Sequence, residues 1–308
     1  MEITENRKLQ VTVAVCTRNR QEMISRCLES LFQQKTEFLY EIICVENDAQ
    51  QKSRKIVEAF SLVSTERNVP FRYFCHPEQN IALARNLAIQ EARGDFLIFI
   101  DDDEWADPLW LQNMMEVQKK TDGDVILGTC IPVFSEDFSP WLKDCFLYRQ
   151  EKFTSECQQV YGAPTNTTLY RLDMLRQRKP PLDPDFGRTG GSDVDLAMYL
   201  MGKGRKIYKT SLAKVYELQT KNRSRVFFHW ERQFRAAVNN YRIVRKNCGR
   251  IMTVKYFFWS LAKNIFAIFH EMIYFYRPRQ TMVNMVGSVC GCLGLIYACL
   301  GFQKRGYY

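Results

Sequence analysis

Short apolar runs alternate with amphipathic segments over the first third of the chain. Runs that are typical of buried strands lie at 11–16, 41–45, 71–75 and 96–100. Apolar residues recur at helical spacing between these runs, over 24–32, 53–60 and 81–92. This order of elements predicts a parallel sheet with right-handed crossovers. Ligands of such sheets bind at the carboxyl ends of the strands.

The pattern becomes less regular after Trp105. It predicts further elements in this order: a helix over 108–119, strands over 124–133 and 166–171, a turn-rich loop over 180–187 and a helix over 193–201. Gly190 and Gly191 precede the last helix and give the backbone freedom there. We therefore expect an α/β domain with a mostly parallel sheet flanked by helices, at residues 1–220.

Residues 221–308 have the character of a helical, membrane-associating region. The chain carries a net charge of +9, and the window 203–250 holds 14 Lys and Arg residues against two acids. Such a block suits the phosphates of lipids, pyrophosphate-bearing substrates or nucleic acid. Its aromatic residues are not spaced as a stacking platform, so we expect no nucleic-acid partner.

An uncharged stretch at 282–302 is long enough to cross a membrane. It is rich in glycine, and Gly287 and Gly291 have the spacing that permits close helix packing. A spanning helix, an in-plane or re-entrant anchor, and a helical pair buried in a soluble dimer all fit this composition.

The eleven cysteines are scattered singly, without the spacing of a zinc site. Residues 1–10 are charged rather than apolar, which argues against a secretory signal peptide. A reduced compartment follows from both observations. We expect the protein to lie on the cytoplasmic face of the cell membrane.

Four acids in sequence, Asp101, Asp102, Asp103 and Glu104, directly follow the fourth strand. Their mutual repulsion is relieved by a divalent cation, and Mn²⁺ and Mg²⁺ prefer carboxylate oxygens. In an extended chain Asp101 and Asp103 point to the same side and Asp102 to the other. Asp101 and Asp103 are therefore the expected donor and metal residues, with helix capping by one of the acids as the alternative.

Polar residues also follow the first two strands. Thr17 and Arg20 come after the first, and Arg20 suits either a phosphate or an acidic partner. Glu46 and Asp48 come after the second and offer acceptors for a nucleotide base and ribose. Arg85 lies near the start of the next helix, where an anion is favoured. Taken singly, the residues after the first two strands fit a helix cap or a turn better than a ligand site.

A resemblance to a known family rests on several motifs taken together, at 17–20, 46–48, 80–86, 101–103 and 190–195. Over residues 10–215 the chain resembles the inverting family-two glycosyltransferases of GT-A fold. The resemblance implies a nucleotide-sugar donor whose base contacts Glu46 or Asp48, with Arg85 along the nucleotide and Asp101 near the ribose. We also expect Thr17, Arg20 and Asp102 among the residues that bind the donor. The resemblance also implies that Asp103 binds the metal and Asp193 is the general base.

Two positions depart from the pattern of that family. Relatives more often have an acid before the catalytic Asp, whereas Ser192 precedes Asp193 here. Relatives commonly begin the second-strand motif with Asp, and this chain has Glu46. Asp195, two residues after Asp193, is expected to be structural.

The C-terminal part resembles bacterial exopolysaccharide transferases of the succinoglycan type, which implies a lipid-pyrophosphate oligosaccharide or polysaccharide acceptor. The residues that carry this resemblance are Glu217, Arg223, His229, Arg232 and Arg235. Arg232 and Arg235 lie three residues apart on one helical face and suit a diphosphate. His229 is either a packed helical histidine or a third metal ligand.

We therefore expect a metal-assisted glycosyltransferase that uses a nucleotide sugar, most simply UDP-linked. Two other functions fit the sequence less well. A sugar nucleotidyltransferase needs a glycine-rich loop after the first strand, and residues 17–20 contain no glycine. A non-catalytic membrane-surface or nucleic-acid binding protein leaves the acids and Asp193 without a role.

Overall fold

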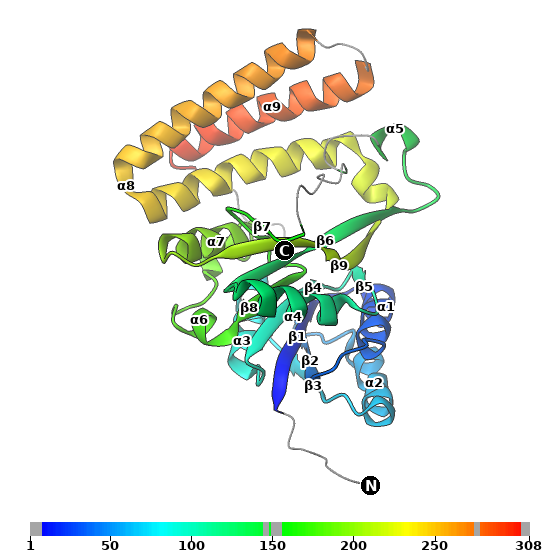
Figure 1. The fold of residues 1–308 in the computed structure, drawn as a ribbon. Coiled ribbons are helices and arrows are strands. Elements are labelled where there is room, and N and C mark those ends of the chain that lie inside the picture. Colours follow the sequence, from blue (N-terminus) through cyan, green and yellow to red (C-terminus); the bar gives the residue numbers. More distant parts are fainter. Residues whose placement is uncertain (1–7, 144–147, 149–155, 274–277, 303–308) are drawn as a thin grey trace.

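A mixed β-sheet lies at the centre of an α/β domain, and a helical region packs on one side of it (Figure 1). The computed structural model describes residues 8–143, 148, 156–273 and 278–302. The strands are β1 (Leu9–Thr17), β2 (Leu39–Glu46), β3 (Phe71–Cys75), β4 (Phe96–Asp101), β5 (Glu104–Ala106), β6 (Val125–Phe134), β7 (Gln158–Gln159), β8 (Thr168–Arg171) and β9 (Ile207–Gln219). Most of the charged N-terminal stretch, at residues 1–7, lies outside the described residues.

The first half of the sheet is parallel, as the sequence predicts. Its strand order is β3-β2-β1-β4, and each strand pairs in parallel with its neighbours. In this register Thr17 pairs with Glu46, and Cys16 pairs with Asp101. The polar ends of β1, β2 and β4 therefore lie side by side at one edge of the sheet.

The second half of the sheet continues as β8-β6-β9-β5 and is mixed. β8 is antiparallel to both β4 and β6, β9 is parallel to β6, and β5 is antiparallel to β9. Asp102 and Asp103 occupy a turn between β4 and β5. The expectation that the acids follow an extended chain is wrong for this reason.

Helices cover both faces of the sheet. The helices are α1 (Gln21–Phe32), α2 (Arg54–Arg67), α3 (Ile81–Glu91), α4 (Trp110–Thr121), α5 (Pro140–Lys143), α6 (Leu172–Arg176), α7 (Ser192–Gly202), α8 (Val226–Ile273) and α9 (Pro278–Cys299), with short 3-10 turns η2 (Pro184–Phe186) and η3 (Lys221–Ser224). Val13 and Val15 of β1 pack with α1, α2 and α4, whereas Ala14 packs with α3, α6 and α7. This division follows from the alternation of side chains along a strand.

The helical region consists of α8 and α9. α8 bends sharply at Gly249, whose φ of 74° favours glycine. Its first half lies across the α/β domain, and its second half runs back beside α9 (Figure 1). Among the described residues, α9 is the one helix long and apolar enough to cross a membrane.

Glycines of α9 allow it to approach α8 closely. A Cβ atom on Gly294 would lie 2.5 Å from the carbonyl oxygen of Phe234, and one on Gly291 would lie 2.9 Å from the Asn264 side chain. A Cβ atom on Gly287 would lie 3.6 Å from the Gln233 side chain, which is an ordinary van der Waals distance. The close packing predicted from the glycine spacing is therefore found between two helices of one chain.

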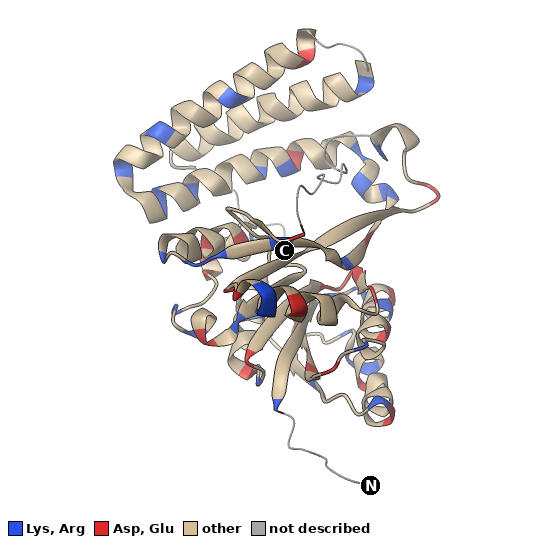
Figure 2. Ribbon diagram, viewed as in Figure 1, with Lys and Arg blue, Asp and Glu red and all other residues tan. Residues whose placement is uncertain are grey.

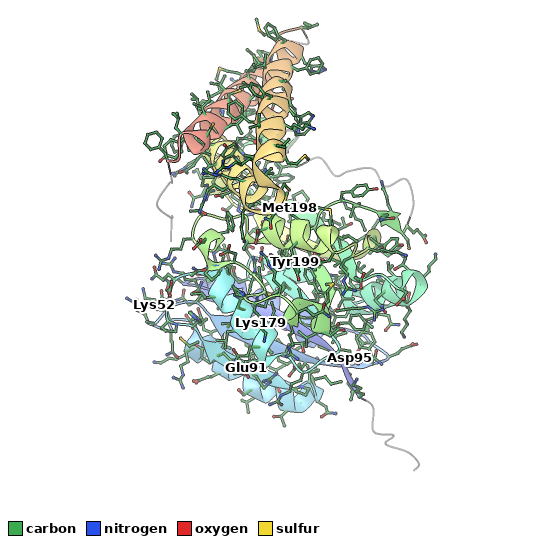
Figure 3. All side chains as sticks on the ribbon, turned by 90° about the vertical axis from the view of Figure 1, so that its left-hand side faces the viewer. Lys52, Glu91, Asp95, Lys179, Met198 and Tyr199 are labelled. Atoms are coloured by element: carbon green, nitrogen blue, oxygen red, sulfur yellow. The ribbon has the colours of Figure 1, made fainter. Side chains whose placement is uncertain are left out.

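A buried ionic cluster joins α7 to the helical region. Asp195 is fully buried and accepts hydrogen bonds from Arg178 at 2.5 Å, from Lys246 at 3.1 Å and from Asn247 at 2.8 Å. Figure 3 shows Met198 on α7 just below the helical region. The structural role expected for Asp195 is confirmed by these contacts.

Candidate active site

The acids after β4 are held by groups from several parts of the chain. Asp102 is buried, and its carboxylate accepts hydrogen bonds from the Thr17 hydroxyl at 2.8 Å and from Arg20 at 2.7 Å. Burial raises the pKa of Asp102, while Arg20 and Thr17 oppose this effect. Of the two partners predicted for Arg20, the acidic one is observed. Asp102 and Arg20 fix the turn that follows β4.

Asp103 lies between two guanidinium groups. Arg223, in η3, donates to its Oδ2 atom at 2.5 Å, and Arg20 lies 3.4 Å from the same atom. Burial raises the pKa of Asp103 to about 6, although both arginines lower it. Arg223 also pairs with Glu217 of β9. A residue 120 positions away in the sequence thus supplies positive charge to the predicted metal ligand.

Glu104 is buried inside the fold rather than exposed to the site. Its carboxylate accepts hydrogen bonds from the Asp101 backbone at 3.0 Å and from Asn166 at 2.6 Å. Burial, followed by the charge of Asp101, raises the pKa of Glu104 well above its usual range. Asn166 lies in an irregular segment before β8, and no local sequence signal predicts this contact.

Asp101 is the most accessible of the four acids, with 44% of its side chain exposed. Arg85 of α3 donates to it at 3.1 Å. The N-terminal cap of α3 is Asn80, whose side chain accepts from the backbone of Ala82 and Leu83. Arg85 therefore lies one turn inside the helix, and its side chain reaches Asp101.

The two acceptors after β2 are both buried. Glu46 accepts hydrogen bonds from the backbone of Ser53 at 2.9 Å and from the Tyr73 hydroxyl at 2.8 Å. Asp48 accepts from the Asn19 side chain at 3.2 Å. Both carboxylates lie at the carboxyl end of β2, and both accept hydrogen bonds from neighbouring protein groups.

Asp193 lies in the first turn of α7 and is half-buried. The N-cap of this helix is Gly191, with a φ of 96°. Burial and the charge of Asp193 raise the pKa of the Tyr170 hydroxyl, and Arg85 lowers it. The Tyr170 ring is buried and lies edge-on to that of Phe99, and the Arg85 guanidinium lies 5.8 Å from the Phe99 ring centroid.

The three C-terminal candidates lie on the first half of α8. Arg232 is exposed and Arg235 is half-buried. His229 is buried, with its ring edge-on to those of Tyr148 and Phe228. Burial, and then Arg232, lowers its pKa. The packed arrangement of His229 is the one observed.

No group of three or more His, Cys, Asp or Glu side chains among the described residues is arranged to hold a metal ion. One carboxylate oxygen of Asp103 nevertheless faces the guanidinium groups of Arg20 and Arg223, so this position accommodates positive charge. The roles predicted for Asp103 and His229 toward a metal therefore stay predictions.

This arrangement has the architecture of a GT-A glycosyltransferase. The S. aureus protein TarS, solved as residues 1–349 with UDP-GlcNAc, superposes with a TM-score of 0.54 at 15% identity, over 96% of this chain and 93% of that one. The structure of GalNAc-T7 with UDP, GalNAc and Mn²⁺ superposes with a TM-score of 0.57 at 13% identity, over 77% and 51%. Likeness at such low identity shows the fold.

The family follows from the sequence comparison. The model of glycosyl transferase family 2 matches residues 12–178, which is more than half of the chain. The succinoglycan biosynthesis protein ExoM of Rhizobium meliloti is 26% identical over 261 residues, covering 83% of this chain and 81% of that protein. This chain belongs to glycosyl transferase family 2, and it is a glycosyltransferase.

Proposed function

We propose that this enzyme transfers a sugar from a UDP-sugar to a hydroxyl group of a lipid-linked or polysaccharide acceptor, with inversion at the anomeric carbon. The observation that carries the proposal is the meeting of Asp101, Asp102 and Asp103 with the ends of β1 and β2 at one edge of the sheet. ExoM is named for succinoglycan biosynthesis, and TarS was solved with UDP-GlcNAc. Both names support this class of donor and product.

The donor side of the site is formed by Asp101 and Arg85. Asp101 is accessible and suits ribose hydroxyls, whereas the Arg85 guanidinium beside it suits a phosphate. Thr17 and Arg20 hold the turn through Asp102, and Glu46 and Asp48 support the nucleotide end of the sheet. In this proposal Arg232 and Arg235 of α8 contact a diphosphate of the donor or of the lipid.

Asp103 fits a divalent cation, either Mn²⁺ or Mg²⁺. Its carboxylate is a hard oxygen ligand that already lies against positive charge from Arg20 and Arg223. A bound cation would stabilise the negative charge of the leaving diphosphate. Arg223 is tied to Glu217 as well, so it keeps an acidic partner when Asp103 binds the cation.

Asp193 is the proposed general base. Asp193 is half-buried and lies in the first turn of α7. An acceptor hydroxyl that attacks the anomeric carbon must lose its proton, and a carboxylate within hydrogen-bond reach accepts it.

The helical region is proposed to bind the cytoplasmic face of the cell membrane. Large apolar side chains are exposed on the second half of α8 and on α9, namely Phe258, Trp259, Phe266, Phe269, Ile273, Met282, Val289, Leu293 and Ile296. Figure 2 shows basic residues, in blue, along α8 with few acidic residues, in red, among them. An apolar surface next to basic residues suits an anionic lipid interface.

The test is UDP release from UDP-glucose and UDP-GlcNAc, with and without Mn²⁺, in the presence of a membrane extract that contains lipid-linked saccharides. We expect release to require Mn²⁺ or Mg²⁺ and to be lost in Asp103→Ala. Asp173→Asn changes an exposed acid on α6 and serves as the matched control. Pyrophosphate formation from UTP and a sugar phosphate would instead identify a nucleotidyltransferase. A lack of turnover with every nucleotide sugar would contradict the proposal.

A further inference from the structure

Arg223 bridges two acids that come from different parts of the chain. Its Nη2 atom donates to Oδ2 of Asp103 at 2.5 Å, and its Nη1 atom donates to Glu217. The function proposed above assigns Asp103 to a divalent cation. The same carboxylate is nevertheless in contact with a positively charged side chain of the protein itself, so the ion and this side chain are alternative partners of one acid.

The sheet brings Arg223 to Asp103 through backbone pairing. β5 and β9 are antiparallel, with Glu104 opposite Glu217, and the Leu218 amide donates to the Asp103 carbonyl at 3.3 Å (Figure 1). The turn η3, which carries Arg223, follows β9 after a single residue. Because both backbones are held by the sheet, the meeting of Arg223 with Asp103 is a property of the fold rather than of one long side chain.

Arg223 also covers the carboxylate that a cation would approach. The Asp103 side chain is 7% exposed, whereas that of Arg223 is 25% exposed. Arg20 lies 3.4 Å from the same oxygen but makes its shorter contact, 2.7 Å, with Asp102. Positive groups that share one carboxylate in a partly buried site repel each other strongly. A divalent cation and the Arg223 guanidinium group therefore compete for Asp103.

The guanidinium group keeps other partners when it leaves Asp103. Its Nη1 atom stays with Glu217, and Oε1 of Gln219 lies 3.4 Å from the same atom. Gln219 in turn donates to Glu217 at 2.7 Å, which holds this acid in place. Release from Asp103 therefore turns one edge of the planar guanidinium group outward while the other edge remains bound.

We propose that Arg223 is an internal counter-ion, which occupies Asp103 in the cation-free enzyme and which a divalent cation displaces on binding. The proposal rests on the function proposed above, because it needs Asp103 to be the metal ligand. Glu217 serves as the pivot that retains the displaced guanidinium group. Arg223 thereby lowers the affinity of the site for the cation and keeps Asp103 paired while no ion is bound.

The first test measures Mn²⁺ binding to the full chain in detergent, from the decrease in the EPR signal of free Mn²⁺. Arg223→Gln is expected to bind Mn²⁺ about tenfold more tightly than the wild type, because the ion no longer has to break a charge-assisted hydrogen bond. Lys221→Gln removes the same charge from an exposed position of the same turn and is the matched control. Its affinity should stay within about twofold of the wild type, since exposed charges contribute little. Asp103→Ala should lose the site.

A second test uses the unaltered protein and does not depend on the folding of Arg223→Gln. Phenylglyoxal modifies accessible guanidinium groups, and peptide mass spectrometry identifies the arginines that have reacted. Saturating Mn²⁺ is expected to speed the modification of Arg223 severalfold, because displacement from Asp103 exposes its side chain. Arg225, an exposed residue two positions further along the chain, is the internal control and should react at an unchanged rate.

The outcomes separate this proposal from the proposed function. Equal Mn²⁺ affinity of the wild type and Arg223→Gln, with binding lost in Asp103→Ala, would overturn the displacement and leave Asp103 as the metal ligand. Weaker binding by Arg223→Gln would overturn it as well, as would labelling of Arg223 that saturating Mn²⁺ leaves unchanged. If neither the wild type nor Arg223→Gln showed Mn²⁺ binding that depends on Asp103, the proposed metal role itself would be refuted, and the displacement with it.

Discussion

Replacing Asp103 with Asn is expected to stabilise the metal-free protein while removing its activity. Burial raises the pKa of Asp103 from 3.8 to about 6 even though Arg20 and Arg223 lie beside it. At about 1.4 kcal/mol for each pH unit, the ionised carboxylate costs the folded state about 3 kcal/mol relative to its protonated form. The neutral amide avoids this cost. Arg223 keeps Glu217 as a partner and Arg20 keeps Asp102.

The dependence on pH provides the sharper assay. The folded-state pKa of Asp103 is above the unfolded value, so the folded wild type holds the proton between about pH 4 and 6 and loses stability as the pH rises through this window. The Asn variant has no such loss. Urea unfolding in EDTA should therefore show little difference at pH 4 and an advantage of the variant that reaches about 3 kcal/mol at pH 7.

A matched control guards this measurement. Asp173→Asn alters an exposed acid, and its free energy of unfolding should stay within about 0.5 kcal/mol of the wild type at each pH. If Asp103→Asn were instead less stable than the wild type at pH 7, the ion pairs with the two arginines would outweigh burial, and the reasoning would be refuted.

Three further changes test other parts of the structure. Asp193→Asn should lower kcat by roughly 10²–10⁴-fold while UDP binding is kept, and an unchanged kcat would exclude it as the base. Asp195→Ala leaves Arg178 and Lys246 without their buried partner and should lower the free energy of unfolding in urea by about 3–5 kcal/mol. Little change would show that the cluster is dispensable. Gly294→Ala should destabilise the packing of α8 on α9 by about 1–3 kcal/mol. The control Gly202→Ala has open space at its Cβ position and should not destabilise the protein. Equal effects of the two substitutions would contradict the close approach of α9 to α8.

The alternation of apolar and polar residues determined the first half of the fold. The strands predicted at 11–16, 41–45, 71–75 and 96–100 lie within β1 to β4, because side-chain periodicity is a local property that survives in any tertiary context. The acid run was predicted at a strand end for the same reason. The sequence also located the apolar stretch at 282–302, most of which forms α9.

Tertiary structure decided which side chains meet. Asp103 and Arg223 are 120 residues apart, and Glu104 and Asn166 are 62 residues apart. The sequence did not predict the turn at Asp102 and Asp103, which directs both acids toward Arg20.

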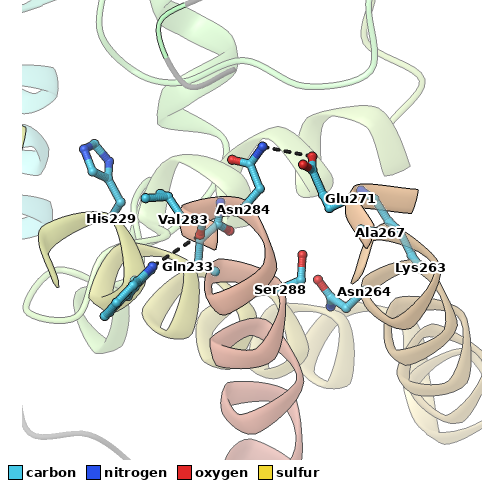
Figure 4. A pocket seen from close by; sticks show the side chains of 11 residues that line it. His229, Gln233, Lys263, Asn264, Ala267, Glu271, Val283, Asn284 and Ser288 are labelled. Atoms are coloured by element: carbon cyan, nitrogen blue, oxygen red, sulfur yellow. Dashed lines mark hydrogen bonds between the residues drawn. The ribbon is translucent and has the colours of Figure 1, made fainter. Parts of the chain in front are cut away.

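Contacts between distant segments depend on the path of the whole chain, so no local pattern predicts them. A polar cavity between α8 and α9 has the same origin (Figure 4). Its lining residues Gln233, Lys263 and Ser288 come together only because α8 bends at Gly249 and folds back beside α9. Sequence periodicity thus predicted the first four strands, and the tertiary structure decided which side chains meet at the acids after β4.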